Sequence, residues 1–212
     1  MTPESVTLAE LERDALTEIV NIGVSRAASN LRKMIGDQVF LSVPSIEVVS
    51  QRRAARLIGE REVSELIAVR QEFKGAFAGR ALLIFPEANS LELVRAVAGN
   101  ELSAQEIIDI ELEALAETGN VILNSCLATM ANMLKRSLEM SIPEVIRGSG
   151  AKLFEIDDYG TGDGLVLFLY IDFAVRNRDI RGYIAMIMDL PSLTILKKLL
   201  EEFIVRIVGE DA

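Results

Sequence analysis

Residues 14–21 read DALTEIVN, and residues 113–120 read EALAETGN. Each segment places a glutamate three residues before an asparagine, and a proline follows that asparagine after the same interval in both cases. All three positions recur at a shift of 99 residues. The residues concerned are Glu18, Asn21 and Pro44 in the first copy and Glu117, Asn120 and Pro143 in the second.

A motif that recurs in register indicates an internal duplication, and such repeats determine the architecture of a chain. We therefore predict one domain over residues 1–212, built from repeats at 7–100 and 103–206. Gly99 and Asn100 form a tight boundary between the repeats rather than a flexible linker. The predicted fold is α/β (α+β), with two long helices related by a pseudo-twofold axis and packed on a shared antiparallel or mixed sheet.

Hydrophobic periodicity predicts a long helix, strands and a final helix in each copy. For the first copy we expect helices at 7–33 and 88–98 and strands at 39–49, 63–73 and 76–85. For the second we expect helices at 103–136 and 192–206 and strands at 141–147, 152–158, 165–176 and 183–188. Capping boxes are predicted at Thr7 with Glu10 and at Ser103 with Glu106. The predicted apolar stripe of the first helix consists of Leu8, Leu11, Ala15, Ile19 and Ile22.

Composition excludes several classes of function. The formal net charge of −10 argues against nucleic acids and anionic membrane surfaces as partners, because both require a basic face. The chain has no histidine and one cysteine, Cys126, so Ser-His-Asp and Cys-His catalysis are excluded and a zinc site is not expected. No apolar stretch approaches the roughly 20 residues that span a bilayer, and the polar N-terminus is not a signal peptide. We therefore expect no membrane insertion and a cytoplasmic location.

The shared spacing places polar side chains in rows along each long helix. Residues at i, i+4 and i+7 share one helical face. The rows are Asp14, Glu18 and Asn21 on the first helix and Glu113, Glu117 and Asn120 on the second. An ordinary hydrated helix face is the alternative interpretation. Asparagine is only a moderate helix former, however, so its retention in both copies favours a functional site that faces solvent or a partner.

The pattern Asp14-x3-Glu18-x2-Asn21-x22-Pro44 resembles the signature of the CheC-type chemotaxis phosphatases, a group that includes CheC, CheX and part of FliY. The residues Glu113, Glu117, Asn120 and Pro143 resemble that signature again, with one departure: glutamate stands at the first position, which is usually Asp or Ser. Chain length and the duplicated layout are most like those of CheC. The resemblance covers nearly the whole chain.

The resemblance implies a hydrolase that removes the aspartyl phosphate from the response regulator CheY. It implies that Asn21 and Asn120 enter the regulator's site and orient the attacking water, and that Glu18 and Glu117 pair with its lysine. Asp14, Glu113, Pro44 and Pro143 are expected to contribute to binding of this partner. The protein would need no cofactor of its own, because Mg²⁺ would reside on the phosphorylated regulator.

Two other hypotheses remain open at this point. A non-catalytic adaptor of the same fold could bind a response regulator or the receptor deamidase CheD. A general structural repeat protein would require the paired motifs to be coincidental. The enzyme is favoured because an adaptor has no need to retain both asparagines.

Overall fold

The computed structural model describes residues 8–43, 45–98, 103–156, 164–175 and 178–210. Within these residues the element order α-β-β-α-β-β-α occurs twice. The first series is α1 (Glu10–Ile35), β1 (Val39–Ser42), β2 (Ile46–Ser50), α2 (Gln51–Arg61), β3 (Leu66–Gly75), β4 (Gly79–Pro86) and α3 (Glu87–Ala98). The second is α4 (Ala104–Met133), β5 (Leu138–Met140), β6 (Glu144–Gly148), α5 (Gly150–Leu153), β7 (Leu165–Val175), β8 (Arg178–Met188) and α6 (Leu190–Glu210).

The strands form one eight-stranded sheet in the order β1-β7-β8-β4-β3-β5, in which β2 also pairs with β7 and β6 with β3. Every pairing is antiparallel. The short strands of each half therefore lie against a long strand of the other half. The predicted fold, two long helices on a shared antiparallel sheet, is confirmed. The limits of the repeats stay a prediction, which the repeated element order supports.

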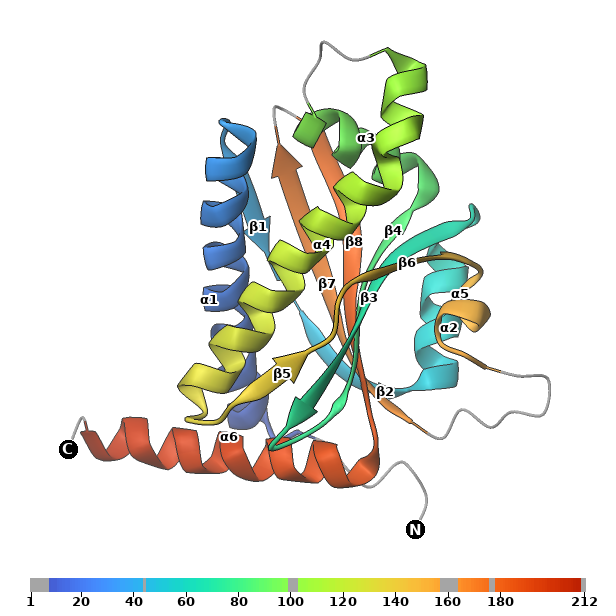
Figure 1. Cartoon of the computed structure of the whole chain (residues 1–212). Helices are drawn as coiled ribbons and strands as arrows, with labels where there is room; N and C mark the ends of the chain where they lie inside the picture. The colour runs from blue at the N-terminus through green and yellow to red at the C-terminus, as the bar shows by residue number, and fades with distance from the viewer. Residues whose placement is uncertain (1–7, 44, 99–102, 157–163, 176–177, 211–212) are drawn as a thin grey trace.

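Helices cover both faces of the sheet (Figure 1). The long helices α1 and α4 lie side by side across one face, where they bury the larger of two apolar clusters. The short helices α2 and α5 pack against each other over the opposite face and enclose the smaller cluster. None of the described helices combines the length and apolar character that crossing a membrane would require.

The buried face of α1 differs from the predicted stripe. Leu8 and Ile19 are buried, but Leu11 is 60% exposed and Ile22 is only partly buried. The helix must contact both the sheet and α4, which widens its buried face beyond one narrow stripe. Its remaining core residues are Leu16, Val20, Val24, Ala27, Ala28, Leu31 and Ile35.

The predicted helix starts are partly confirmed. At α4, Ser103 Oγ accepts from the Glu106 N–H, and the Glu106 carboxylate accepts from the Ser103 N–H at 2.8 Å, which forms the expected capping box. Thr7 lies outside the described residues. Helix α1 begins at Glu10 instead, where the Ala9 N–H donates to the Glu12 carboxylate at 2.7 Å. Glu12, and not Glu10, is therefore the glutamate that caps this helix.

Several predicted elements are wrong in type or extent; for example, the strand predicted at 183–188 begins already at Arg178. The single strand at 39–49 is two strands, β1 and β2, which both pair with β7. The strand at 152–158 is wrong, because residues 150–153 form the short helix α5, capped by the Ser149 side chain; residues 157 and 158 lie outside the described part. The strand at 141–147 begins only at Glu144. Residues 51–61, for which the pattern predicts no element, form α2.

Gly119 determines how closely α4 approaches the sheet. A Cβ atom at this position would lie 2.5 Å from Val69 Cβ on β3, closer than packed atoms approach. We therefore expect Gly119→Ala to lower the free energy of unfolding by about 1–3 kcal/mol through overpacking. Urea denaturation would measure this change.

A second replacement tests the cause of that loss. Val69→Ala should recover only part of the stability in the Gly119→Ala background, because it removes the two methyl groups that would lie 2.6 Å from the added Cβ but keeps Val69 Cβ. Gly59→Ala in α2 is the matched control, since a Cβ atom added there would have no neighbour within 4 Å. There the gain in helix propensity should stabilise the protein slightly. Equal losses at both glycines would contradict this account of packing.

Candidate functional site

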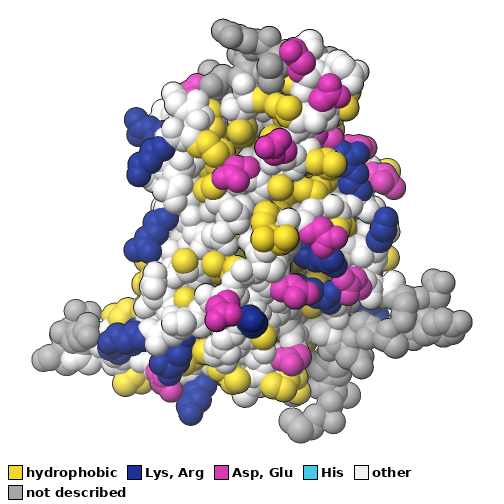
Figure 2. Space-filling view, in the orientation of Figure 1, with side chains coloured by type: hydrophobic (Ala, Val, Ile, Leu, Met, Phe, Trp, Pro, Cys, Tyr) yellow, Lys and Arg dark blue, Asp and Glu magenta, His cyan; other side chains and the backbone are white. Residues whose placement is uncertain are grey.

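The two polar rows lie on the outer sides of α1 and α4. The four carboxylates are exposed, whereas both asparagines are half-buried. Figure 2 shows acidic side chains set among apolar ones over the face where α4 runs. The predicted rows therefore face outward, and each ends in an amide where the helix meets the rest of the protein. The carboxylates are Asp14, Glu18, Glu113 and Glu117.

Close packing of α1 on α4 brings the two helices into one surface. A Cβ at Gly23 would lie 2.9 Å from Cys126 Cα, so a side chain at that position would force the helices apart. Arg26 extends from α1 and donates to Thr129 Oγ1 on α4 at 3.3 Å. Cys126 is fully buried in this contact, and burial raises the pKa of its thiol to about 12. It is therefore a core residue and not a nucleophile.

Asn21 at the first site is bound to the backbone of the chain itself. Its Oδ1 accepts from the Val43 N–H at 3.1 Å, and its Nδ2 donates to the Val43 carbonyl at 3.4 Å. Val43 is buried in the interval between β1 and β2. Both amide atoms therefore have a partner, although each retains one further hydrogen-bonding position. Pro44, the next residue, lies outside the described part of the chain.

A shallow hollow of about 370 Å³ adjoins Asn21 on α1. Glu18 and Asn21 line it together with residues one and two turns further along the helix. The remaining lining residues are Ile22, Ser25, Arg26 and Ser29. The first glutamate and asparagine thus open onto the same depression, which is wide enough to receive a side chain or a phosphoryl group.

Asn120 at the second site is held by side chains instead. Its Oδ1 accepts from Gln71 Nε2 at 3.2 Å and from Asn124 Nδ2 at 2.6 Å. The preceding residue of the loop, Ile142, is 87% exposed, in contrast to the buried Val43 of the first copy. Pro143 follows it and is partly buried. In the second copy, the described backbone before the proline therefore makes no hydrogen bond to the asparagine amide, whereas the Val43 backbone does so in the first copy.

Sequence reasoning did not identify two of these partners. Gln71 is 1% exposed, and the residues two positions away on either side, Val69 and Phe73, belong to the main apolar cluster. A lone polar residue at an inward position of an apolar strand is a signal that could have been used. The Val43 backbone carries no such signal, because any residue supplies the same groups.

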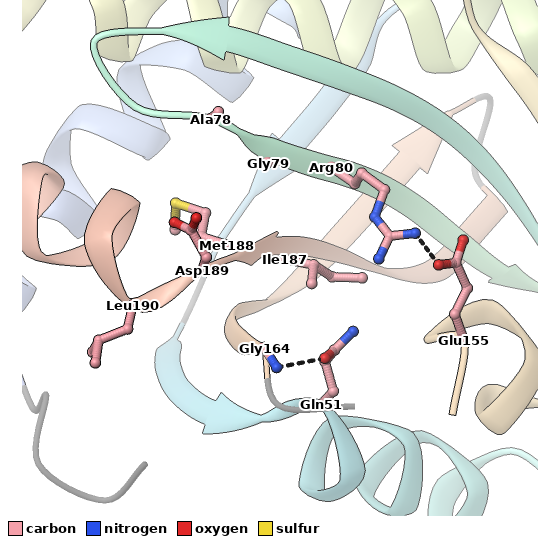
Figure 3. Close-up of a pocket in the computed structure, with 10 residues that line it drawn as sticks. All are labelled: Gln51, Ala78, Gly79, Arg80, Glu155, Gly164, Ile187, Met188, Asp189 and Leu190. Atoms are coloured by element: carbon pink, nitrogen blue, oxygen red, sulfur yellow. Dashed lines mark hydrogen bonds and ion pairs between the residues drawn. The ribbon is translucent and has the colours of Figure 1, made fainter. Parts of the chain in front are cut away.

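A larger cavity elsewhere in the described residues is not part of either row. It has a volume of about 650 Å³ and lies between β4, the end of β8 and the start of α2 (Figure 3). Its charged groups already have partners, since Arg80 forms an ion pair with Glu155. Buried Gln51 accepts from the Gly164 N–H at 2.7 Å and donates to the Phe154 carbonyl, so it joins α2 to the second half. These contacts are structural.

Metal-binding side chains do not converge in the described ranges. No group of three or more Asp, Glu, Cys or His side chains there could hold a metal ion. The rows of carboxylates are spread along their helices, each ending in an amide. Their chemistry therefore suits hydrogen bonding and charge pairing with a partner.

Two family models match different parts of the chain. The model described as CheC-like family matches residues 11–48, and the model described as chemotaxis phosphatase CheX matches residues 67–161. The first match contains the first glutamate, asparagine and proline, and the second contains the later three. Both candidate sites thus fall inside matched regions.

Curated relatives belong to the same group. The flagellar motor switch phosphatase FliY of Bacillus subtilis is 24% identical over 145 residues, which cover 68% of this chain but 37% of FliY. The CheY-P phosphatase CheC of the same organism is 25% identical over 141 residues, which cover 65% of this chain and 67% of CheC. The chain thus spans little more than a third of the FliY sequence.

Solved structures share the fold. FliY from Thermotoga maritima has a TM-score of 0.71 and 18% identity, with 93% of this chain and 100% of that chain covered. The FliM middle domain from H. pylori has a TM-score of 0.64 and 10% identity, with 91% and 99% covered. Taken with the two family models and the curated relatives, these matches confirm that the chain resembles the CheC-type group of chemotaxis proteins, which includes CheC, CheX and FliY.

Proposed function

We propose that this protein is a phosphatase that hydrolyses the aspartyl phosphate of a CheY-like response regulator. One observation carries the proposal: an exposed glutamate and a half-buried asparagine recur one turn apart on two long helices, inside the regions that the two family models match. The relatives named as CheY-P phosphatases supply the substrate class. The regulator and this protein would meet in the cytoplasm.

An amide suits the chemistry of this reaction. Hydrolysis of an acyl phosphate requires a water molecule in line with the bond that breaks, and stabilisation of the charge on the phosphoryl oxygens. Asn21 and Asn120 can hydrogen-bond water without adding negative charge. A carboxylate at the same place would repel the phosphoryl group by roughly 4 kcal/mol for each close pair of unit charges at an effective dielectric near 20.

The other residues of the rows would bind the partner. Glu18 and Glu117 are exposed one turn before the asparagines, where they could pair with a lysine beside the phosphorylated aspartate. Asp14 and Glu113 extend the same face by one turn. Pro44 and Pro143 would contribute to binding of the partner. The proposal assigns Mg²⁺ to the regulator, since the described carboxylates form no cluster that would hold it.

Phosphate release from a phosphorylated receiver domain tests this function. We expect the protein to accelerate release in the presence of Mg²⁺, at substoichiometric concentration and with multiple turnovers. A receiver domain that binds this protein but loses phosphate at its intrinsic rate would contradict the proposal.

A non-catalytic adaptor is the second candidate. It is favoured by one observation, the pairing of both Asn21 amide atoms with the Val43 backbone, because this pairing leaves each atom only one position for a water molecule. Its partner would be a response regulator or a CheD deamidase. Binding without any change in phosphate release would support the adaptor.

A further inference from the structure

Gln71 is the only buried polar residue described on the inward side of β3, and its side chain reaches α4. Its Nε2 donates to the Ser141 carbonyl at 2.9 Å and to Asn120 Oδ1 at 3.2 Å. A third, longer contact joins the same Nε2 to Asn124 Oδ1 at 3.4 Å. Gln71 therefore connects the sheet, the loop before Pro143 and the candidate catalytic asparagine.

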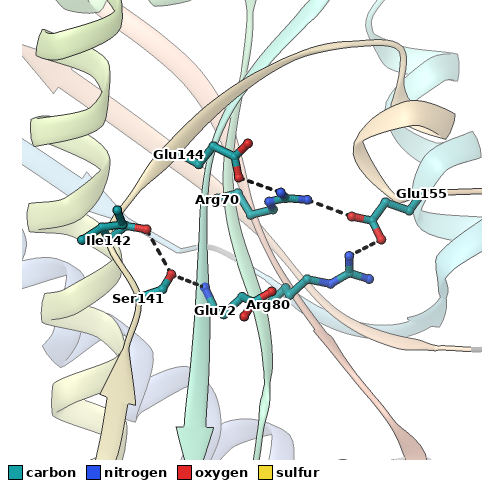
Figure 4. A network of polar contacts seen from close by, with 7 residues as sticks. All are labelled: Arg70, Glu72, Arg80, Ser141, Ile142, Glu144 and Glu155. Carbon is teal, nitrogen blue, oxygen red and sulfur yellow. Dashed lines mark hydrogen bonds and ion pairs between the residues drawn. The ribbon is translucent and has the colours of Figure 1, made fainter.

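The orientation of the Gln71 amide is determined by the backbone. Ser141 is fixed to β3, because its N–H donates to the Glu72 carbonyl at 2.9 Å and its Oγ accepts from the Glu72 N–H at 2.9 Å (Figure 4). Its own carbonyl can only accept a hydrogen bond. The nitrogen of Gln71, and not the oxygen, must therefore face Ser141.

This orientation in turn fixes the Asn120 amide. Asn120 Oδ1 receives a hydrogen from Gln71 and another from Asn124, and these two donors use both lone pairs of the oxygen. Asn120 Nδ2 has no hydrogen-bond partner among the described residues. The group that remains available to a bound phosphoryl centre is therefore the N–H donor. Donors of this kind stabilise developing negative charge.

The first site has no counterpart of Gln71. Ser42 pairs with Asp172 on β7 as Ser141 pairs with Glu72 on β3, so Ile171 occupies the position that Gln71 holds. Ile171 is buried and has no donor in its side chain. Asn21 is held instead by the Val43 backbone. The two copies thus position the same asparagine by different means.

We infer that Gln71 is a positioning residue of the second site, which orients Asn120 so that its amide nitrogen faces the attacking water and the phosphoryl oxygens. The inference rests on the proposed function. The Oε1 of Gln71 supports it, because this buried atom has no hydrogen-bond partner in the described structure. An unsatisfied buried oxygen lowers stability. The Gln71 side chain thus costs stability at its oxygen, while its nitrogen holds Ser141 and Asn120.

Gln71→Met tests this role, because methionine has a similar shape and no donor. The test uses two background variants, each with one intact site. Asn21→Ala keeps only the second site intact, and Asn120→Ala keeps only the first. In the Asn21→Ala protein we expect Gln71→Met to lower kcat roughly ten- to hundredfold with little change in KM, the scale of a misplaced catalytic group. In the Asn120→Ala protein kcat should be unchanged. The free energy of unfolding should fall only modestly, because the Ser141 carbonyl and Asn120 Oδ1 each lose a donor while the unpaired Gln71 Oε1 is removed.

Other outcomes would overturn the inference. Equal loss of kcat in both backgrounds, or no loss in the Asn21→Ala background, would show that Gln71 does not act through Asn120. If Gln71→Met fails to fold, Asn124→Ala serves as the second variant. It removes the other donor to Asn120 Oδ1 and should lower kcat in the Asn21→Ala background alone.

A readout that does not depend on turnover separates this inference from the proposed function. The side-chain amide of Asn120 should give an NMR signal that shifts in Gln71→Met, while the Asn21 amide signal stays in place. If the wild-type protein releases no phosphate, the proposed function fails. The orientation of Asn120 is then judged from the NMR signals, and an unchanged Asn120 signal would overturn it.

Discussion

Replacing both Asn21 and Asn120 by alanine is expected to abolish the accelerated release of phosphate, with a loss of about 100-fold or more. This is the scale observed when one positioned hydrogen-bond donor is removed from a catalytic site. Binding of the phosphorylated regulator should remain, because the exposed glutamates are unchanged. Alanine is the best helix former, but it also leaves the Val43 backbone and the Gln71 amide without the asparagine partner, so the free energy of unfolding of the double variant would be measured as well. Phosphate release and binding would be measured on the same preparation.

Single replacements assign the activity to each site. We expect each to leave partial activity, because the asparagines lie on different helices and act independently. Asn30→Ala is the matched control, since Asn30 is an exposed asparagine of α1 outside the row. It should leave the rate unchanged. A double variant that still releases phosphate at the original rate would refute the chemistry assigned to the amides.

Replacing both Glu18 and Glu117 by glutamine should weaken binding more than turnover. Glutamine keeps the shape of the side chain but removes the charge that would pair with a lysine of the partner. We expect KM to rise about tenfold, which corresponds to about 1.4 kcal/mol of binding free energy, with kcat reduced less. Steady-state kinetics over a range of phosphorylated regulator would separate the two parameters.

Salt provides the check on that interpretation. An ion pair at a solvent-accessible interface weakens as ionic strength rises. The KM of the wild-type protein should therefore increase with salt, and the KM of the double glutamine variant should depend on salt less. Glu201→Gln, at an exposed position of α6, a helix that carries neither row, is the control. A loss of kcat at unchanged KM would contradict the anchoring role.

Much of this fold can be predicted from the sequence because its long elements have strong patterns. Periodicity places the helices α1 and α4 and the strands β3, β4 and β7 to within a few residues. It does not predict helix α2, because the sequence of that helix, QRRAARLIGER, is dominated by charge. It buries only Gln51, Ala54 and Ile58, and such a short face does not stand out from a solvated segment.

The candidate site can be predicted in outline and not in detail. Helical spacing alone places each glutamate and asparagine on one face, and the structure exposes that face. The partners of the asparagines lie on other elements, at Val43 and Gln71, and helical periodicity contains no information about them. The two asparagines have different partners because a different residue of the sheet lies beneath each long helix. That relation is created only when the halves pack together.

The exchange of short strands between the two halves affects the order in which the protein can form during synthesis. Residues 39–42 complete their pairing only with residues 172–175, near the far end of the chain. Until β7 leaves the ribosome, β1 and β2 lack the neighbour they have in the finished sheet. During this interval the unpaired edges of β1 and β2 can pair with strands of other chains. An isolated first half should therefore aggregate, and a protein made of one half alone would have to recruit a second copy to complete its sheet.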